Sequence, residues 1–429
     1  MKILYVTQYY PPEYVSSANR AGQLSAQFAG SNNSVVVLTT YPNHPAGRRL
    51  PGLGVSYARD EILGPTWRVH RFPVIERPNT GILYRMLTYG SFYVSGIWWA
   101  TSHLHQLMRY KPDVVIATTG PFLVPWLGLF LARLGHCPLV VEFRDITYRA
   151  AEAIGMSKRH QLVDKMLRWL ELHPAWHARG VVCVTEGFAE VLSQDGIPRS
   201  RLKVIRNGAQ SSHTRGQVGP LDPVVLGYVG TLGVSQDLAA LLRTWARVER
   251  LTGRARLILV GDGARRSELV NMAHDLGLNH VEFRPAVSHE QVGNIYEECT
   301  WCIVSLRNTK EFQETVPSKV YELLALGKPA VFLGPAGEAS RIVSAAGGRC
   351  CYARDPADIA SFLVNEIFGS DEEDLQLVAS TESVYAAGRF TWDRLGQEYL
   401  KYLDEIVART SRESMKLPGG RLGGADHGE

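Results

Sequence analysis

The chain has 429 residues, 45% of them hydrophobic and 21% charged, with 46 lysines and arginines against 42 aspartates and glutamates. A chain this long exceeds one ordinary hydrophobic core, so we expect two domains. The formal charge of +4 excludes a strongly basic nucleic-acid-binding protein and favours anionic ligands or surfaces only weakly.

The first apolar segment predicts a buried strand and not a secretion signal. Residues 3–6 form a run much shorter than a signal h-region, and Pro11, Pro12 and Glu13 follow without a small-residue cleavage site. A helix with small residues at its start comes after this loop. A strand that ends in a loop before a helix is how open α/β sheets build ligand sites.

Continuous apolar runs alternate with helical patterns along the whole chain. We expect buried strands at residues 2–7, 35–40, 68–72, 113–118, 138–143, 180–185, 224–230, 256–261, 280–283, 302–306 and 329–333. Runs this apolar, separated by helices, indicate parallel strands covered on both faces. The alternation predicts a doubly wound α/β architecture.

Residues 81–110 predict a long helix with apolar and aromatic residues almost all round. Two interpretations fit. Its tryptophans and tyrosines, flanked by Arg85 and Arg109, suit a membrane interface, where amphipathic rings lie at headgroup level. A helix buried in the core explains the same pattern.

Charged residues end the strand expected at 138–143. Glu142, Arg144 and Asp145 favour a strand that leaves the sheet into a ligand site, although a structural Arg–Asp pair explains them too. Arg206 follows a later apolar run, directly before residues 207–223, which are rich in Gly, Ser and polar residues. That segment predicts a linker.

The linker divides the chain into an N-terminal domain over residues 1–206 and a C-terminal domain over residues 224–390. An amphipathic helix is expected over 391–410, packing back on the N-terminal domain, and residues 411–429 have the composition of a disordered tail. Two doubly wound domains that face each other form one deep cleft where the carboxyl ends of their strands meet.

Two glycine-containing loops follow strands of the C-terminal domain. Gly230 and Gly233 precede a helix expected from about Asp237, whose free N–H groups can bind a phosphate. Gly261 and Gly263 repeat this pattern before Arg265 and Arg266. An ordinary strand-to-helix turn explains either loop, so each alone is weak evidence.

The segment from residue 311 to residue 332 is more specific because Glu314 and Glu322 stand eight residues apart. We expect a helix from near Ser318, which can cap it. Lys319 at the N-terminus of that helix opposes the helix dipole, and a bound anion would explain its presence. Glu322 is placed to accept the two vicinal hydroxyls of a ribose, although a capping acid on a solvated turn explains it as well.

The cysteines predict neither a disulfide framework nor a metal site. There are six in 429 residues, and Cys299 and Cys302 form a Cys-x-x-Cys pair without a second pair at zinc spacing. Buried small apolar residues in a reducing cytosol are the interpretation that we adopt. No segment reaches ~20 uninterrupted apolar residues, so no membrane span is expected.

Nine segments, in order and spacing, carry a resemblance to a known family: YYPPEYVSSANRAGQLSAQF, PDVVIATTGPF, VVEFRD, VVCVTEGFAEVL, VIRNGA, YVGTLGVSQDLAALL, LILVGDG, VEFRPAVSHEQV and VPSKVYELLALGKPAV. The chain resembles the family 4 glycosyltransferases of the GT-B fold over about residues 1–408. Within them it is similar to the bacterial surface-polysaccharide branch, such as the colanic acid and O-antigen N-acetylfucosamine transferases.

The resemblance implies retaining transfer of a sugar, of the hexosyl or N-acetylhexosaminyl type, from a nucleotide diphosphate sugar to a glycan or polyprenyl-diphosphate-linked acceptor. It implies no cofactor and no metal, in agreement with the absence of an Asp-x-Asp motif from the sequence. A cytoplasmic enzyme at the inner face of the plasma membrane, with peripheral contact through residues 81–110, fits this function.

Site residues carry over position by position. Glu314 and Glu322 fall on the family's Glu-x7-Glu motif, which implies that Glu322 binds the ribose and that Glu314 lies near the transferred sugar. Ser318 and Lys319 match the diphosphate position. Gly230, Thr231 and Gly233 match the phosphate loop, and Gly261 and Gly263 are assigned to the donor site with them.

Three departures from the family pattern affect the expected chemistry. Ser16 and Ser17 replace a Gly-Gly pair in the first loop, where they and Arg20 are expected to contact the sugar or its phosphate. Thr231 and Gln236 replace basic residues, which shifts phosphate neutralisation to Lys319 and Arg206. Arg144-Asp145 replaces a His-Asp pair, and because arginine cannot accept a proton, no dedicated side-chain base is expected there.

Catalysis is therefore assigned to Lys319, Glu314, Arg144 and Asp145 without a dedicated base, with a donor phosphate oxygen taking the acceptor's proton. Two alternatives share the fold. One is a non-hydrolysing enzyme similar to UDP-GlcNAc 2-epimerase, and the other is a non-catalytic protein that binds nucleotide sugars.

Overall fold

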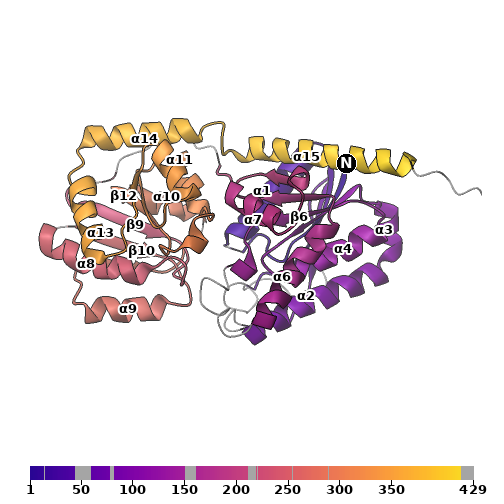
Figure 1. Cartoon of the computed structure of the whole chain (residues 1–429), viewed down its shortest axis with the longest axis horizontal. Helices are drawn as coiled ribbons and strands as arrows, with labels where there is room; N and C mark the ends of the chain where they lie inside the picture. Colours follow the sequence, from indigo (N-terminus) through magenta and orange to yellow (C-terminus); the bar gives the residue numbers. More distant parts are fainter. Residues whose placement is uncertain are drawn as a thin grey trace, which may run out of the picture.

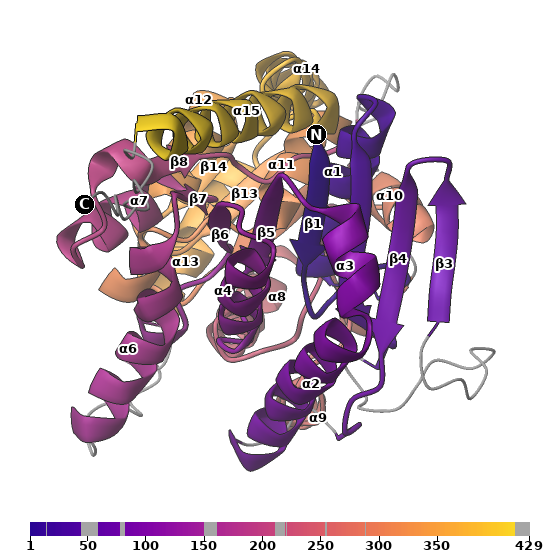
Figure 2. The same ribbon diagram turned by 90° about the vertical axis from the view of Figure 1, so that its right-hand side faces the viewer.

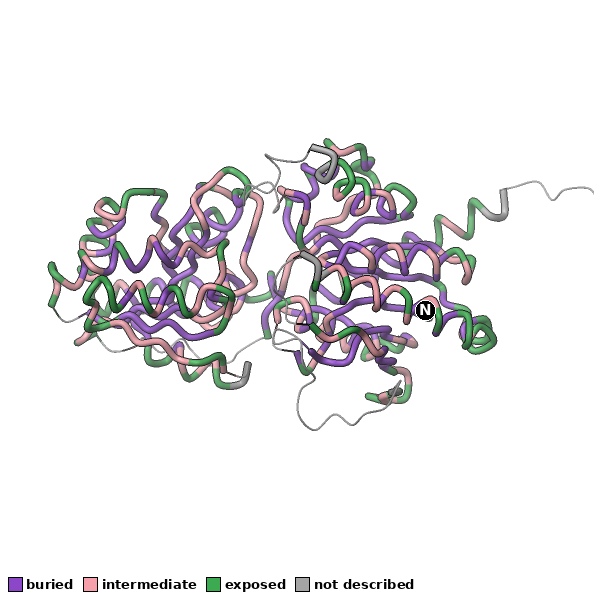
Figure 3. Tube along the Cα trace, turned by 90° about the horizontal axis from the view of Figure 1, so that it is seen from below, coloured by how far each residue is buried: buried purple, intermediate pink, exposed green. Residues whose placement is uncertain are grey.

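The computed structural model describes residues 1–13, 15–43, 59–77, 82–149, 161–210, 219, 221–253, 255–287 and 289–416. Two α/β domains lie side by side along the long axis of the molecule, and the last helix runs along the N-terminal domain (Figure 1). Each domain has its own sheet of predominantly parallel strands, which confirms the predicted α/β class and two-domain organisation. Figure 3 shows buried strands enclosed by more exposed helices in both domains.

The N-terminal sheet has eight strands in the order β3-β4-β2-β1-β5-β6-β7-β8. Their bounds are β1 Lys2–Val6, β2 Ser34–Thr40, β3 Arg59–Gly64, β4 Trp67–Phe72, β5 Val114–Thr118, β6 Leu139–Phe143, β7 Gly180–Cys183 and β8 Leu202–Val204. Every pair is parallel except β3 with β4, which is antiparallel. The expectation of parallel strands alone is therefore wrong at this edge (Figure 2).

Helices cover both faces of this sheet. The helix α1 (Ser16–Gly30) packs on one face. The other face carries α2 (Ile82–Ser102), α3 (Leu104–Tyr110), α4 (Val124–Leu134), α6 (Gln161–His177) and α7 (Glu186–Gln194). The single helix predicted over residues 81–110 is interrupted at His103, whose φ of −110° and ψ of 26° are not helical.

The C-terminal sheet has six parallel strands in the order β11-β10-β9-β12-β13-β14. Their bounds are β9 Val225–Val229, β10 Arg256–Val260, β11 Val281–Arg284, β12 Trp301–Ser305, β13 Ala330–Leu333 and β14 Arg349–Cys351. Its helices are α8 (Leu238–Thr252), α9 (Arg266–Asp275), α10 (His289–Glu297), α11 (Ser318–Leu326), α12 (Glu338–Ala345), α13 (Pro356–Phe362) and α14 (Glu372–Ala386). The helices α8, α9 and α13 pack on one face of this sheet, and α10, α11 and α12 pack on the other face.

The chain passes between the domains at two adjacent points. The N–H of Ala209 donates to the carbonyl of Phe390 at 2.8 Å, and Ala209 forms a parallel bridge with Thr391. A side chain at Gly208 would meet Phe390 and Trp392, because its Cβ would lie 2.9 Å from atoms of both. Part of the expected linker over residues 207–223 is therefore fixed against the returning chain.

The last helix, α15 (Trp392–Lys416), completes the N-terminal domain (Figure 2). Tyr399 and Leu403 are fully buried against the face that α1 covers, and the Tyr399 ring lies 5.3 Å from that of Phe28. The helix continues to Lys416, so the predicted end at residue 410 is too early, and residues 417–429 of the expected tail lie outside the described residues.

No helix within the described ranges combines the length and the apolar content needed to cross a membrane.

Leu403→Ala should destabilise the N-terminal domain by about 2–5 kcal/mol, because it leaves a cavity in a fully buried site. Leu377→Ala on α14 is the matched control, since Leu377 is 65% exposed and should change stability by less than about 0.5 kcal/mol. Urea unfolding followed by circular dichroism measures both variants. Equal effects would contradict the packing of α15 on this domain.

Candidate functional site

The two glycine loops of the C-terminal domain rest on each other. The N–H of Gly230 donates to Val260 and that of Leu232 to Asp262. A Cβ at Gly261 would lie 1.9 Å from the Gly230 carbonyl oxygen, and one at Gly263 would lie 2.4 Å from that of Leu232. Gly261 and Gly263, both at positive φ, thus let the second loop support the first. The predicted contact of Gly261 and Gly263 with the donor stays a prediction.

Lys319 reaches the first glycine loop from α11. Its Nζ lies 3.5 Å from the centre of the Tyr228 ring, over the ring face. A Cβ at Gly230 would lie 2.9 Å from the same Nζ, so glycine leaves the space that the ammonium occupies. Thr231 is exposed on this loop, and its carbonyl accepts a hydrogen bond from the Tyr228 hydroxyl. Gly233 lies next to the side chain of Gln236.

The Lys319 ammonium is buried and has no hydrogen-bond partner among the described residues. Desolvation lowers the pKa of Lys319 to about 7, while the Glu322 carboxylate acts in the opposite direction. Ser318 and Lys319 are the first two residues of α11, where backbone N–H groups have no partner within the helix. Pro317 occupies the N-cap, so the predicted capping by Ser318 is wrong. An ammonium and free N–H groups together suit a bound anion.

Glu314 lies against the N-terminal domain. A Cβ at Gly187, in the first turn of α7, would lie 2.4 Å from the Glu314 Cβ. Glycine at position 187 therefore allows the backbone of one domain to contact the side chain of the other. Glu322, one turn along α11 from Lys319, is partly exposed on the C-terminal domain.

Arg206 forms an ion pair across the domains. Its Nη2 donates to Glu338 Oε1 at 3.0 Å, and the second Glu338 oxygen accepts the N–H of Gly187 at 3.2 Å. Glu338 is the first residue of α12 and was not predicted. The only signal in the sequence is an acidic residue directly after Gly337, ahead of a helical pattern.

Arg144 contacts the start of α1, where two more of the residues predicted in the N-terminal domain lie. Arg144 donates from Nη1 to the Ser17 carbonyl at 2.8 Å and from Nη2 to Thr118 Oγ1 and the Thr119 carbonyl. It therefore holds the start of α1, where Ser16 is exposed and Ser17 is half-buried. The structure does not contain the alternative, a structural Arg144–Asp145 ion pair, because the two Nη atoms of Arg144 bond to backbone and hydroxyl oxygens.

Asp145 is exposed to solvent, but protein atoms around its carboxyl displace part of the water that would solvate it. This partial desolvation raises the pKa of its carboxyl to about 6, against the opposing effect of the Arg144 cation. The segment after it is fixed by Glu171, whose carboxylate accepts the N–H groups of Thr147 and Tyr148. Burial raises the pKa of Glu171 to about 7.

Arg20 does not reach the surface. It is 1% exposed and pairs with the fully buried Glu142, with Nε 3.2 Å from Oε1. Its Nη atoms donate to the carbonyls of Ile205 and Arg206. The geometry thus assigns Arg20 to fixing the end of the N-terminal domain, in place of the predicted sugar contact.

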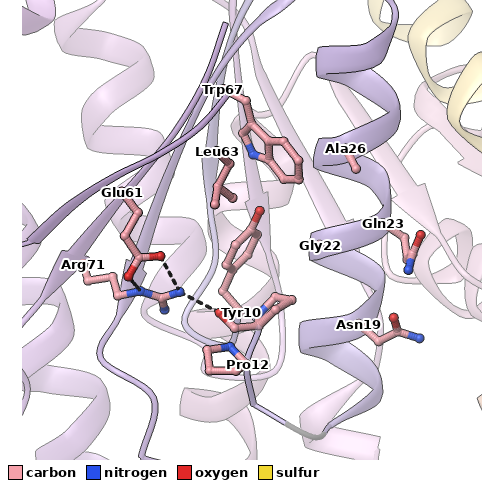
Figure 4. Close-up of a pocket in the computed structure, with 11 residues that line it drawn as sticks. Tyr10, Pro12, Asn19, Gly22, Gln23, Ala26, Glu61, Leu63, Trp67 and Arg71 are labelled. Atoms are coloured by element: carbon pink, nitrogen blue, oxygen red, sulfur yellow. Dashed lines mark hydrogen bonds and ion pairs between the residues drawn. The ribbon is translucent and has the colours of Figure 1, made fainter. Parts of the chain in front are cut away.

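A pocket of about 530 Å³ lies away from these groups, between α1 and the β3–β4 edge (Figure 4). Tyr10, Leu63 and Trp67 supply apolar surface, as Figure 4 shows. Its charged pair is already satisfied, since Arg71 donates to Glu61 and to the Pro11 carbonyl. Tyr10, Pro11 and Pro12, in the loop after β1, therefore line a pocket whose surface is mostly apolar.

Two family models match this chain. The model described as Glycosyl transferase 4-like domain matches residues 17–208, and the model described as Glycosyl transferases group 1 matches residues 223–365. The two matched ranges fall on the two sheets and together span most of the chain.

Known proteins are similar over most of this length. The putative colanic acid biosynthesis glycosyl transferase WcaI of Escherichia coli K12 is 23% identical over 353 residues, which cover 78% of this chain and 84% of that protein. Among solved structures, the sucrose-phosphate synthase of Thermosynechococcus elongatus has a TM-score of 0.71 at 16% identity, covering 95% of this chain and all of that one. Anabaena HepE in complex with UDP-glucose has a TM-score of 0.66 at 17% identity, covering 94% and 100%. These likenesses confirm the predicted GT-B fold.

The pKa of Lys319 predicts a pH dependence of anion binding. A lysine with a pKa of about 7 loses its proton as the pH rises above neutrality, and the neutral amine no longer attracts phosphate. Affinity for UDP or GDP should thus fall roughly tenfold between about pH 7 and about pH 8.5, where the terminal phosphate is already ionised. Isothermal titration calorimetry measures this fall.

Lys319→Met is the control and should show weaker, nearly constant affinity across the same interval. A wild-type affinity that is equally constant would contradict a role for the Lys319 ammonium in anion binding.

Proposed function

The chain is a glycosyltransferase of the family that joins a glycosyl transferase 4-like domain to a group 1 domain, and we propose that it makes a surface polysaccharide. The reaction is retaining, metal-independent transfer of a sugar from a nucleotide diphosphate sugar to a glycan or polyprenyl-linked acceptor. The similarity to WcaI, a putative colanic acid biosynthesis enzyme, supports the polysaccharide class, and the similarity to a HepE complex with UDP-glucose supports the donor class.

The buried, unpartnered ammonium of Lys319 is the observation that carries this proposal. It lies beside Gly230 and at the N-terminus of α11, so a diphosphate placed there gains an ammonium and free N–H groups. Glu322, on the same helix, then lies on the ribose side, and Glu314 lies where the two domains meet. Thr231, Gly233 and Ser318 surround this position and remain proposed donor contacts.

The proposed chemistry needs no dedicated side-chain base. The bond between the sugar and the phosphate oxygen breaks, the acceptor oxygen bonds to the anomeric carbon on the same face, and the acceptor proton passes to the departing phosphate. Lys319 stabilises the negative charge that develops on this diphosphate. Arg144 remains a cation held by backbone oxygens, whereas Asp145, with a pKa of about 6, is a carboxylate at neutral pH and can stabilise positive charge on the sugar.

The acceptor side is proposed to contact a membrane through α2 and α3. Val94 and Trp98 of α2 are 65% and 63% exposed, and Met108 of α3 is 51% exposed. Trp99, in contrast, is buried in the core, so the core interpretation holds for one face of α2 and membrane contact is proposed for the other face. Asp113 is the only acidic residue between Arg77 and Val141, which favours an anionic surface.

Lys319→Ala should lower the turnover of sugar transfer by more than ~100-fold, because it removes the cation at the departing diphosphate. Product formation from a panel of UDP and GDP sugars measures the loss. Lys401→Ala, which removes an exposed lysine of α15, is the control and should keep full turnover. Near-normal transfer by Lys319→Ala would exclude this role.

Trp98→Ser combined with Val94→Ser should reduce sedimentation with anionic liposomes by roughly tenfold, since two exposed apolar side chains leave the interface. Leu377→Ser on α14 is the matched control, with a side chain that is also 65% exposed. Unchanged binding of the double variant would count against membrane contact through α2.

A further inference from the structure

Arg206, predicted to help neutralise the donor phosphates, is already paired with an acid of the other domain. Its guanidinium donates to Glu338 Oε1 at 3.0 Å, and Glu186 Oε1 lies 3.9 Å away. The Glu338 side chain is only 5% exposed, whereas that of Arg206 is 31% exposed. The ion pair is therefore partly shielded from water and lies between the domains.

Glu338 also binds the first turn of α7. Its Oε2 accepts the N–H of Gly187 at 3.2 Å, one of the N–H groups that have no partner within the helix. A carboxylate at this position also interacts favourably with the helix dipole. One side chain of the C-terminal domain thus contacts two separate groups of the N-terminal domain.

The same residue is joined to the backbone beside Glu314. The N–H of Glu338 donates to the Gln313 carbonyl at 2.9 Å, and a Cβ at Gly337 would lie 2.2 Å from that oxygen. Glu314 in turn packs on Gly187. Glu338, the 313–314 backbone and the first turn of α7 therefore form one connected unit.

Arg206 is fixed on the opposite side of this unit. Its carbonyl accepts a hydrogen bond from Arg20 Nη1 at 2.7 Å, and Arg20 pairs with the fully buried Glu142. The contact at Glu338 therefore has a rigid base in the N-terminal sheet, and any separation of the domains must break it.

We propose that Glu338 is a positioning residue for sugar transfer, which sets the position of Glu314 relative to the N-terminal domain by bridging Arg206 and the N-terminus of α7. This inference rests on the proposed function. In the proposed bridge, Arg206 holds the domains together, and Lys319 remains the cation of the donor site. Loss of the bridge leaves donor binding intact and slows transfer.

The test compares Glu338→Ala and Arg206→Ala with Glu190→Gln. Glu190 is the matched control, because it lies one turn further along α7 and its exposed carboxylate accepts a hydrogen bond from Gln194. Glu338→Ala should lower kcat by ~100-fold, the scale of a small misplacement of reacting groups, and leave Kd for UDP or GDP within about twofold. The double variant should lose no more than the worse single variant.

Small-angle X-ray scattering supplies a readout that does not depend on turnover. With saturating UDP or GDP, the radius of gyration of Glu338→Ala should exceed that of the wild type and of Glu190→Gln. Unchanged kcat, additive losses in the double variant, or nucleotide affinity that falls in parallel with kcat would each overturn the proposal. If the wild type transfers no sugar from the panel, the proposed function fails, and an unchanged radius of gyration then overturns the bridge independently.

Gly187→Ala tests the same contact without altering a charge. Alanine favours a helix over glycine, so α7 itself should not lose stability. The added methyl would lie 2.4 Å from the Glu314 Cβ and should force the domains apart. A similar loss of kcat with an unchanged melting temperature supports the proposal, and full kcat overturns it.

Discussion

A buried ion pair between Arg20 and Glu142 is the interaction on which the junction of the domains depends. Both side chains are almost completely excluded from water, so either one without the other would leave an uncompensated charge in the core. The pair lies inside the N-terminal domain, yet Arg20 also binds the carbonyls of Ile205 and Arg206, where the chain leaves that domain. The buried Arg20–Glu142 pair thus fixes the backbone at Arg206, whose side chain contacts Glu338 of the other domain.

Close approach between backbones is the second constraint on the site. Gly261 and Gly263 let their loop stack on the loop of Gly230 at distances that a Cβ would forbid, and Gly230 leaves space beside its own backbone. The space created this way is filled by one ammonium, that of Lys319, above an aromatic ring. Gly187 applies the same device between the domains. Absent side chains therefore shape this site as much as the charged ones do.

The sequence predicts the buried, apolar strands well, and it predicts edge strands and very short strands less well. All eleven expected strands are present, whereas β3, β8 and β14 were missed. The strand β3 is a mixed, partly exposed edge strand, and the other two have three residues each, so none has a pattern that distinguishes it. Lys319 could be predicted because a cation at a helix N-terminus is locally unfavourable. Arg20 and Glu338 could not be assigned correctly, because their partners lie more than 120 residues away along the chain.

The return of α15 to the N-terminal domain determines the order in which the molecule can be completed during synthesis. The C-terminal sheet is built from consecutive segments, so all of its strands are available once residue 351 has been made. One face of the N-terminal sheet lacks Tyr399, Leu403 and Ile406 until the ribosome has passed them. Until then, the apolar surface under α15 is open to water and to other chains. The domain that is translated first is therefore the last to close its core.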